Sequence, residues 1–373
     1  MTHFLINSLK GGGAERLVLN ICKEFDQADI LITEPRIDYP TDSVSIVTLT
    51  GIWNRFKYGG IPFAALRLKN YVQENELVIV SLFRSFLLIY LFSFLRNIKY
   101  ICWVHNDTKI YVKNPLVKWL YKKIFLRASK IVVNSQKAKK DLSNLALCKE
   151  EKVEVIYNYL DFQRIHKLKE EPVEKAIDFQ KETIFIAAGR LHKIKGFNHL
   201  IEAFALASQK GMKAKLVILG DGEERERLLN KIEALKLSKQ VLLLGFKKNP
   251  YPYIKNSKAL LFSSLSEGFG NTILESIICG TPVISTDIDS GPREILSKKE
   301  NYLFRTKAVE FANFGILMPA FDNDSAIEIW ANTLLEITNK RSLLEDYKNL
   351  DLNDLDVFSD EKIIQQWKEI ITL

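Results

Sequence analysis

Short runs rich in β-branched and aliphatic residues alternate along the sequence with amphipathic segments, and this alternation limits the possible folds most strongly. In the N-terminal half such runs lie at 3–6, 29–33, 44–49, 77–81, 100–105, 130–135 and 153–158. Segments between them, such as Ala14–Phe25, have the apolar spacing of helices. Strand–helix alternation is typical of parallel sheets covered by helices, so the sequence predicts an α/β protein.

The alternation is interrupted by a polar, charged stretch at Lys167–Lys181. It begins again with runs at 183–189, 214–220, 241–245, 258–264 and 281–286. Because 373 residues exceed what one ordinary core accommodates, we predict two Rossmann-like domains with a seam near 160–182. We assign the N-terminal domain to 1–165 and the C-terminal domain to 166–357.

The composition is that of a globular protein, with 47% apolar and 26% charged residues. The cysteines are too far apart in sequence for a metal knuckle or a CxxC redox pair. We therefore expect free, buried thiols in a reducing compartment, at Cys22, Cys102, Cys148 and Cys279. Met1–Ile6 leads directly into a strand-like run, so we expect no signal peptide and a cytoplasmic location.

Positive charge is concentrated in the N-terminal half. The chain carries +8 overall, and residues 1–165 hold 24 Lys and Arg against 15 Asp and Glu, which gives +9. The segment 118–130 predicts a basic amphipathic helix with cations at Lys118, Lys122, Lys123 and Arg127. A solvated helix face would explain this pattern. A surface that attracts nucleic acid or an anionic membrane would explain it equally well, and charge alone does not separate these partners.

One apolar run, Ser85–Leu95, has 11 residues between Arg84 and Arg96. A membrane-spanning helix needs about 20 apolar residues, so this run is too short to cross a bilayer. We favour a buried helix of the α/β domain. A helix that dips partly into a membrane is the alternative.

A glycine-rich turn opens the first domain. Gly11, Gly12 and Gly13 follow a predicted strand and precede a helix that starts at about Ala14. Backbone amides at a helix N-terminus after such a turn can bind an anion. The spacing is not the GxGxxG of dinucleotide-binding folds, so that interpretation is weak. A tight turn without a ligand is the alternative.

Two cations lie in the loop after the first strand of the second domain. Arg190 and Lys195 belong to "GRLHKIKG", between a predicted strand and a predicted helix. Loops at the carboxyl ends of parallel strands face the ligand crevice of an α/β domain. A guanidinium fork and an ammonium group suit a diphosphate, so we predict a phosphate site here. Two surface cations would be the alternative.

The stretch "SSLSEGFGNTILESIICGTPVIS", residues 263–285, predicts a buried strand, a glycine-rich loop and a helix. We expect the helix to start at Asn271 or Thr272, to reach Ile278 and to stop at Gly280. Its first amides, together with the flexible backbone of Gly268-Phe269-Gly270, would approach a phosphate in the same crevice.

Two carboxylates flank this turn, eight residues apart. Glu275 lies one turn into the helix, where it could accept a ribose hydroxyl. Glu267 lies in the loop, where it could meet the group beyond the phosphate. A capped helix with two solvated acids would be the alternative, which the nearby cations and glycines make less favourable.

Four motifs resemble those of the glycogen-synthase-like retaining glycosyltransferases, family 4, of the GT-B fold. They are "GGGAER", "GRLHKIKG", "LVILGDGEERERLL" and "SLSEGFGNTILESIICGTPVISTDIDSGPREIL". The match is strong over about 184–296 and looser in the N-terminal half. The Glu-x7-Glu motif of the family corresponds to Glu267 and Glu275. The "GGAER" and "SGPREIL" subset is similar to bacterial enzymes that build lipid-linked or surface polysaccharides.

The resemblance implies a role for each matching residue. Arg190 and Lys195 would hold the donor diphosphate, and Glu275 would bind the ribose. Glu267 would contact the donor sugar near its reacting carbon. His105 would face the same sugar, although taken alone it could be a satisfied loop histidine. Further donor contacts would come from Gly12, Gly13, Gly245, Phe246, Phe269, Gly270, Asn271 and Thr272.

The chemistry of the reaction argues against a metal requirement. Breaking a glycosyl–phosphate bond builds negative charge on the diphosphate, which Arg190, Lys195 and the helix N-terminus are placed to stabilise. We expect no cofactor beyond the nucleotide-sugar donor, with UDP favoured over GDP and retention of configuration implied by the family. Asp287–Asp289 is similar to the DxD motif of metal-dependent sugar transferases, but it follows the wrong strand and we interpret it as a loop.

The resemblance also implies a lipid-linked or surface-polysaccharide acceptor and transfer of a hexose or N-acetylhexosamine. The basic N-terminal half would face that acceptor on the inner face of the cytoplasmic membrane. Segments 109–130 and 85–95 would form the membrane surface. The last helix, in 358–373, would pack back on the first domain through Trp367.

Three alternatives stay open at this point. A nucleotide-sugar epimerase of the same fold would keep the phosphate loops and would turn over without an acceptor. A nucleic-acid-binding protein would explain the basic pI, but no nucleic-acid-binding motif is present, so we expect no nucleic-acid partner. A Rossmann oxidoreductase is the weakest alternative, because this sequence lacks the GxGxxG fingerprint of that class.

Overall fold

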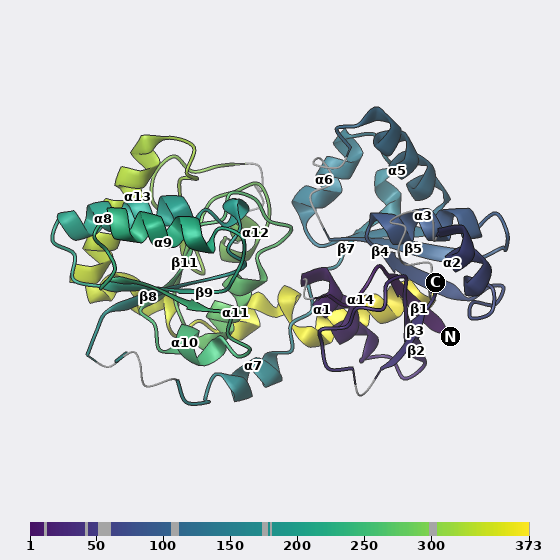
Figure 1. The fold of residues 1–373 in the computed structure, drawn as a ribbon, viewed down its shortest axis with the longest axis horizontal. Helices are drawn as coiled ribbons and strands as arrows, with labels where there is room; N and C mark the ends of the chain where they lie inside the picture. The colour runs from purple at the N-terminus through teal and green to yellow at the C-terminus, as the bar shows by residue number, and fades with distance from the viewer. Residues whose placement is uncertain are drawn as a thin grey trace. The chain divides into compact units, whose positions relative to one another are not determined.

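The computed structural model describes residues 1–10, 13–41, 44–50, 61–105, 112–173, 178–179, 181–297 and 304–372 (Figure 1). The chain forms two compact units, Met1–Tyr159 with Val357–Leu373, and Leu160–Asp356. Each unit has its own sheet and core. The predicted boundary between residues 165 and 166 lies inside α7 (Phe162–Leu168), which belongs as a whole to the second unit.

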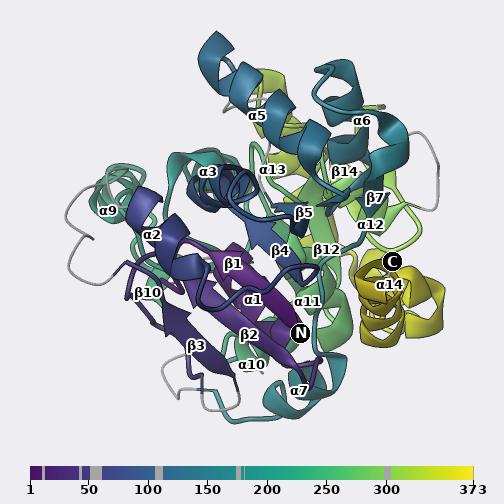
Figure 2. The same cartoon turned by 90° about the vertical axis from the view of Figure 1, so that its right-hand side faces the viewer.

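The sheet of the first unit is parallel, with the order β3-β2-β1-β4-β5-β6-β7. Figure 2 shows β3, β2, β1 and β4 side by side. Each strand matches a predicted apolar run. The central strands carry nearly continuous apolar sequence because they are buried on both faces. The strands are Thr2–Ile6 (β1), Ala28–Ile32 (β2), Ser45–Thr48 (β3), Leu77–Ser81 (β4), Lys99–Val104 (β5), Lys130–Val133 (β6) and Val153–Val155 (β7).

Helices cover both faces of this sheet. One face carries α2 (Ile61–Leu68), α3 (Phe83–Phe92), α5 (Pro115–Arg127) and α6 (Gln136–Asn144). The other face carries α1 (Gly13–Cys22) and the last helix, α14 (Asp360–Thr372). Trp367 of α14 is buried against Trp103 of β5, with ring centroids 4.6 Å apart. The end of the chain is therefore part of the core of the first unit.

The sheet of the second unit has the order β10-β9-β8-β11-β12-β14-β13, parallel except for β13. The strands are Ile184–Ala188 (β8), Lys215–Leu219 (β9), Val241–Gly245 (β10), Ala259–Phe262 (β11), Val283–Thr286 (β12), Glu310–Phe311 (β13) and Ile316–Met318 (β14). The last two were not predicted. The α/β fold class with two Rossmann-like halves is confirmed.

Helices also flank the second sheet. α8 (Phe197–Gln209), α9 (Arg225–Ala234) and α13 (Asp324–Asn339) share one core with it. α10 (Tyr251–Lys255) and α11 (Asn271–Cys279) lie on the opposite side of the sheet in Figure 1. The remaining elements are α12 (Pro292–Leu296) and the 3-10 helices Glu150–Lys152, Lys193–Lys195, Arg341–Tyr347 and Leu352–Phe358.

The apolar run 85–95 forms most of α3 and is largely buried, which supports the favoured prediction. Its exposed side chains lie at the C-terminal end, where Leu91, Phe94 and Leu95 are 46%, 60% and 60% exposed. Across the described part of the chain, every helix is too short or too polar to cross a bilayer.

All four cysteines are free, as predicted, although Cys148 is half-buried rather than buried. Burial raises the pKa of Cys22 and of Cys279 to about 12, so both thiols stay protonated at neutral pH. They act as small core residues.

Candidate active site

Two loops of the second unit meet at the carboxyl ends of neighbouring strands. One loop runs from β8 to α8 and the other from β11 to α11, and β8 pairs with β11. Leu265 N donates to Ile194 O at 2.7 Å, and Ser263 Oγ donates to Lys195 O at 2.8 Å. Gly196 has φ +65°, and a Cβ there would lie 2.1 Å from Ser263 O. Only glycine permits this close approach of the two loops.

Lys195 and Glu267 are brought together by this approach. Lys195 Nζ lies 2.5 Å from Glu267 Oε1, and Ser264 Oγ donates to the same oxygen at 2.6 Å. The two charged side chains are only 21% and 15% exposed. Among the described residues these groups have no further side-chain partner, so the second carboxylate oxygen and two ammonium hydrogens are available to a ligand. Ser264 was not identified from the sequence, because a serine before a glycine-rich loop carries no distinctive pattern.

Arg190 does not join that pair. Its side chain is 73% exposed, and Nη2 donates to Glu223 Oε2 at 3.4 Å. Glu223, which follows β9, also lies 3.4 Å from His192 Nε2. The two predicted phosphate cations therefore belong to two different ion pairs, one exposed and one largely buried. Because an exposed ion pair with one long contact contributes little free energy, Arg190 can leave Glu223 and reorient toward a ligand at little cost.

The helix after the second loop begins and ends close to the predicted positions. α11 starts at Asn271, after its N-cap residue Gly270 with φ +98°, which has no side chain to cap the helix. It ends at Cys279, and Gly280 with φ +79° follows. The N-terminus of α11 therefore presents a positive dipole end at the carboxyl edge of the sheet.

Neither glutamate of the motif is a solvated surface acid. Glu275 is 6% exposed, and Tyr251 Oη donates to its Oε1 at 3.4 Å. Phe269 is buried, so only its backbone is available to a ligand, whereas Asn271 and Thr272 are half-buried. This geometry disfavours the alternative of a capped helix with two exposed carboxylates.

The turn after β12 holds the Glu267 loop in place. Ser290 Oγ donates to the backbone carbonyl of Glu267. Gly291 has φ +83°, and a Cβ there would lie only 1.4 Å from Phe269 O. No residue other than glycine fits at this position without moving the loop that carries Glu267.

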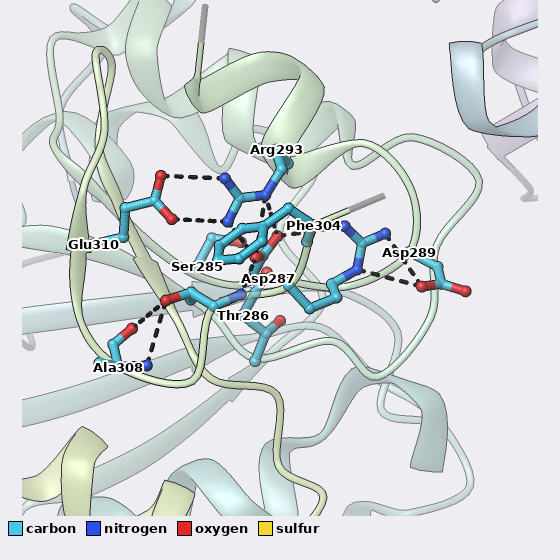
Figure 3. A network of polar contacts seen from close by, with 10 residues as sticks. Ser285, Thr286, Asp287, Asp289, Arg293, Phe304, Ala308 and Glu310 are labelled. Atoms are coloured by element: carbon cyan, nitrogen blue, oxygen red, sulfur yellow. Dashed lines mark hydrogen bonds and ion pairs between the residues drawn. The ribbon is translucent and has the colours of Figure 1, made fainter. Parts of the chain in front are cut away.

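A buried ion-pair network anchors this turn (Figure 3). Both oxygens of Asp287 lie 3.1 Å from Arg293 Nε, and Thr306 N donates to Asp287 Oδ2 at 2.7 Å. The Arg293 guanidinium also donates to both oxygens of Glu310, at 3.1 and 2.9 Å. Phe304 covers the guanidinium, with its ring centroid 4.9 Å away. Asp287 is thus a structural carboxylate, in agreement with the interpretation of "DID" as a loop.

Over the described ranges, no group of three or more His, Cys, Asp or Glu side chains is arranged to hold a metal ion. The second aspartate of the "DID" sequence, Asp289, pairs with Arg305. The Nη2 atom of Arg305 lies 3.1 Å from Oδ1 of Asp289.

The predicted base-binding residues lie at the end of β10. Gly245 has φ +72° with open space where a Cβ would be, and Phe246 is 76% exposed. An exposed phenylalanine ring at a strand end offers a flat apolar surface for stacking.

In the first unit, His105 directly follows β5 and is buried. Its Nε2 lies 3.1 Å from Ser81 Oγ, and its ring centroid is 4.4 Å from that of Trp103. Burial lowers the pKa of His105 to about 3, so the imidazole is neutral at physiological pH. Its Nδ1 has no hydrogen-bond partner among the residues that the structure describes. Gly13 begins α1, whereas Gly12 lies outside the described residues.

The basic segment of the first unit is shorter than predicted. α5 ends at Arg127, whereas Lys130 lies in β6 and pairs with Glu154 at 2.7 Å. Arg127 stacks on Phe94, with its guanidinium carbon 4.3 Å from the ring centroid. The other predicted cations, Lys118, Lys122 and Lys123, are exposed beside Trp119, which is 52% exposed.

Comparison with known proteins defines the class. The model of Glycosyltransferase Family 4 matches residues 11–164, and that of Glycosyl transferases group 1 matches residues 169–316. An uncharacterized glycosyltransferase of Methanocaldococcus jannaschii is 33% identical over 313 residues, covering 78% of this chain and 76% of its own. A Campylobacter jejuni enzyme, N-acetylgalactosamine-N,N'-diacetylbacillosaminyl-diphospho-undecaprenol 4-alpha-N-acetylgalactosaminyltransferase, is 30% identical and covers 92% of each chain.

Solved structures share the whole fold. The crystal structure of Anabaena HepE in complex with UDP and glucose has a TM-score of 0.79 at 20% identity, covering 100% of this chain and 99% of its own. The crystal structure of TarM has a TM-score of 0.77 at 14% identity, covering 100% and 98%. The chain belongs to the family 4 glycosyltransferases and has their GT-B fold, as the motifs predicted. It is therefore an enzyme of the glycosyltransferase class.

Proposed function

We propose that this glycosyltransferase moves a hexose or N-acetylhexosamine from a UDP-sugar to a lipid-linked or surface-polysaccharide acceptor. The transfer retains the anomeric configuration and needs no metal ion. The observation that carries the proposal is the largely buried pair of Lys195 and Glu267, the latter in the loop that leads into the N-terminus of α11. The relatives support the acceptor class, since the Campylobacter jejuni enzyme is named for a diphospho-undecaprenol acceptor and an Escherichia coli relative for O-antigen biosynthesis.

The leaving group is stabilised by fixed charge. An ammonium group has three donors, and one of those of Lys195 is directed to Glu267, which leaves two for the diphosphate. The amides at the start of α11 and the exposed guanidinium of Arg190 add further positive potential. These groups stabilise the charge that develops as the glycosyl–phosphate bond breaks.

Glu267 is held from three sides for its role at the donor sugar. Lys195 and Ser264 bind its side chain, and Ser290 binds its backbone carbonyl. A carboxylate fixed in this way can stabilise positive charge on the reacting carbon without reorganising during the reaction. Glu275, positioned by Tyr251, binds the ribose, and Phe246 stacks on the base.

His105 acts as a neutral hydrogen-bonding group. Because its pKa lies at about 3, it does not serve as a general acid at neutral pH. With Nε2 facing Ser81, Nδ1 is the ring atom left to bind a sugar hydroxyl.

The same charges support the proposal that no metal ion is needed. The cations and helix amides supply the positive potential that a metal would otherwise provide. The carboxylate that most resembles a metal ligand, Asp287, already has both oxygens bonded to Arg293.

The reaction class is tested with a panel of UDP-sugars in EDTA, with and without a membrane extract that supplies acceptors. We expect product with the extract only, and an anomeric proton coupling that matches the α-linked donor. Conversion of the nucleotide sugar without the extract would instead identify an epimerase. An inverted product would contradict retention.

Peripheral membrane binding is supported by a mixed basic and apolar surface on α3 and α5. The exposed cations of α5 stand beside Leu116, Trp119 and Leu126, which are 64%, 52% and 49% exposed. The C-terminal end of α3 adds Phe94, on which Arg127 stacks. Aromatic rings that flank lysines are typical of helices in the membrane interface. We place this surface on the inner face of the cytoplasmic membrane.

Changing Lys118, Lys122 and Lys123 together to glutamine should weaken binding to phosphatidylserine vesicles roughly 100-fold, at about 1 kcal/mol per lysine. Vesicle sedimentation measures the change, and nucleotide affinity should stay unaltered. The matched control changes three exposed lysines of the second unit, Lys213, Lys236 and Lys239. Equal vesicle binding by the two triple variants would reject the surface on α5.

A further inference from the structure

The carboxyl edge of the first sheet holds a buried arginine whose donors are only partly used. Arg84, the second residue of α3, is 7% exposed. Its Nη1 donates to Glu34 Oε1. Within the described ranges, neither its Nε nor its Nη2 has a hydrogen-bond partner. A guanidinium stays charged in proteins, and buried donors without partners are rare, so these two nitrogens need an explanation.

The sheet order shows where the guanidinium lies. Arg84 follows β4 and Glu34 follows β2, and β1 lies between these two strands. The hydrogen bond between the side chains of Arg84 and Glu34 therefore spans the carboxyl end of β1. Ligands of open parallel sheets bind at this edge.

The N-terminus of α3 begins at the same edge. Its N-cap residue, Leu82, has φ +70° and ψ +147° and gives no side-chain hydrogen bond to the helix. Non-glycine residues rarely adopt this conformation. Asn7 follows β1, and its Oδ1 accepts hydrogen bonds from Ser85 N at 3.2 Å and from Ser85 Oγ at 2.8 Å. The positive end of the α3 dipole and the Arg84 guanidinium are thus held together at one place.

We propose that Arg84 and the N-terminus of α3 form an anion subsite that takes a phosphoryl group of a substrate. Nε and Nη2 share one edge of the guanidinium, and that edge matches two oxygens of a phosphate in a bidentate contact. Glu34 binds Nη1 and so fixes the orientation of this edge. The charge of +9 over residues 1–165 favours an anionic ligand. The subsite rests on the proposed function, in which a UDP-sugar donor and a lipid-diphosphate acceptor both carry phosphoryl groups.

The subsite is tested by binding of inorganic pyrophosphate in EDTA, which requires no transferase activity. The parent is the full chain with Arg190→Ala and Lys195→Ala, which removes the predicted phosphate cations of the second unit. Isothermal titration should show saturable pyrophosphate binding that Arg84→Lys weakens about tenfold or more, because lysine loses the bidentate fork. Absence of saturable binding in the parent, or equal binding after Arg84→Lys, would overturn the proposal.

Glu34→Gln is the matched variant, and it keeps the test decisive if Arg84→Lys does not fold. It retains Arg84 and removes a neighbouring negative charge, so pyrophosphate should bind more tightly than in the parent. If Arg84 and Glu34 form only a structural ion pair, both variants lower the melting temperature and leave pyrophosphate binding unchanged, which refutes the subsite.

Kinetics on the otherwise unaltered enzyme then identify the source of the phosphoryl group. An Arg84→Lys enzyme with a KM for the acceptor raised about tenfold, and an unchanged KM for the donor, assigns the group to the acceptor. The reverse result assigns it to the donor. Both results support the subsite, whereas two unchanged KM values contradict it.

Discussion

Replacing Glu267 by glutamine is expected to reduce sugar transfer by about a thousandfold or more, the loss typical of a removed electrostatic group at a reacting centre. Glutamine keeps the shape of the side chain and can still accept from Ser264 and Lys195, so the fold should persist. Initial rates at saturating donor and acceptor measure the loss, and the melting temperature should change by no more than a few degrees.

The matched control for this variant is Glu223→Gln. Glu223 also pairs with a predicted phosphate cation, but its side chain is 51% exposed and its contact to Arg190 is 3.4 Å long. We expect a loss of transfer of about threefold or less, because exposed ion pairs contribute little. Full transfer by Glu267→Gln would remove this residue from the active site, whereas equal losses in both variants would point to a general effect of charge.

Replacing Arg293 by methionine is expected to destabilise the second unit by about 3–5 kcal/mol, the range for breaking a buried ion pair. Asp287 and Arg293 are 1% and 3% exposed, so the variant leaves a carboxylate buried without its main partner. For a unit of this size the loss corresponds to a fall in melting temperature of roughly 10 °C. Thermal unfolding of the full chain measures it.

Two companion variants separate the buried pair from general effects. Arg305→Met removes a cation that pairs at 3.1 Å with Asp289, which is 72% exposed, and that lies 3.8 Å from Asp287. Because Arg293 remains as the main partner of Asp287, this variant should cost about 1 kcal/mol. Arg293→Met combined with Asp287→Asn should recover part of the lost stability, because the buried charge is removed together with its partner. A small loss in Arg293→Met alone would show that the network of Figure 3 does not anchor the turn.

The central strands of each sheet could be predicted from the sequence. They are buried on both faces, and such strands have continuous apolar sequences. β14 and β13 were missed because Ile316–Met318 and Glu310–Phe311 are too short to form such a run. We predicted a basic helix up to Lys130 because the positively charged residues continue past Arg127. In the structure the helix ends at Arg127, and Lys130 begins β6.

The sequence predicted those parts of the candidate site that depend on local patterns, namely its loops and the start of its helix. Glycines at strand ends and the helix start after Gly270 have sequence signatures, and these predicted that the loops of Lys195 and Glu267 face one crevice. The structure shows that the two loops follow the paired strands β8 and β11. Which cation pairs with which acid depends on the folded arrangement. Lys195 pairs with Glu267, 72 positions away, whereas Arg190 pairs with Glu223.

Thermal unfolding of the full chain in EDTA with UDP, GDP, NAD or no nucleotide tests the central claim, metal-independent binding of a UDP-sugar, most directly. A ligand at 100 times its Kd stabilises the folded state by about 2.7 kcal/mol, which raises the melting temperature by a few degrees. We predict this rise with UDP alone. A rise with GDP instead would contradict the proposed donor. A rise with NAD, or no rise with any of the three nucleotides, would contradict the account of the phosphate loops.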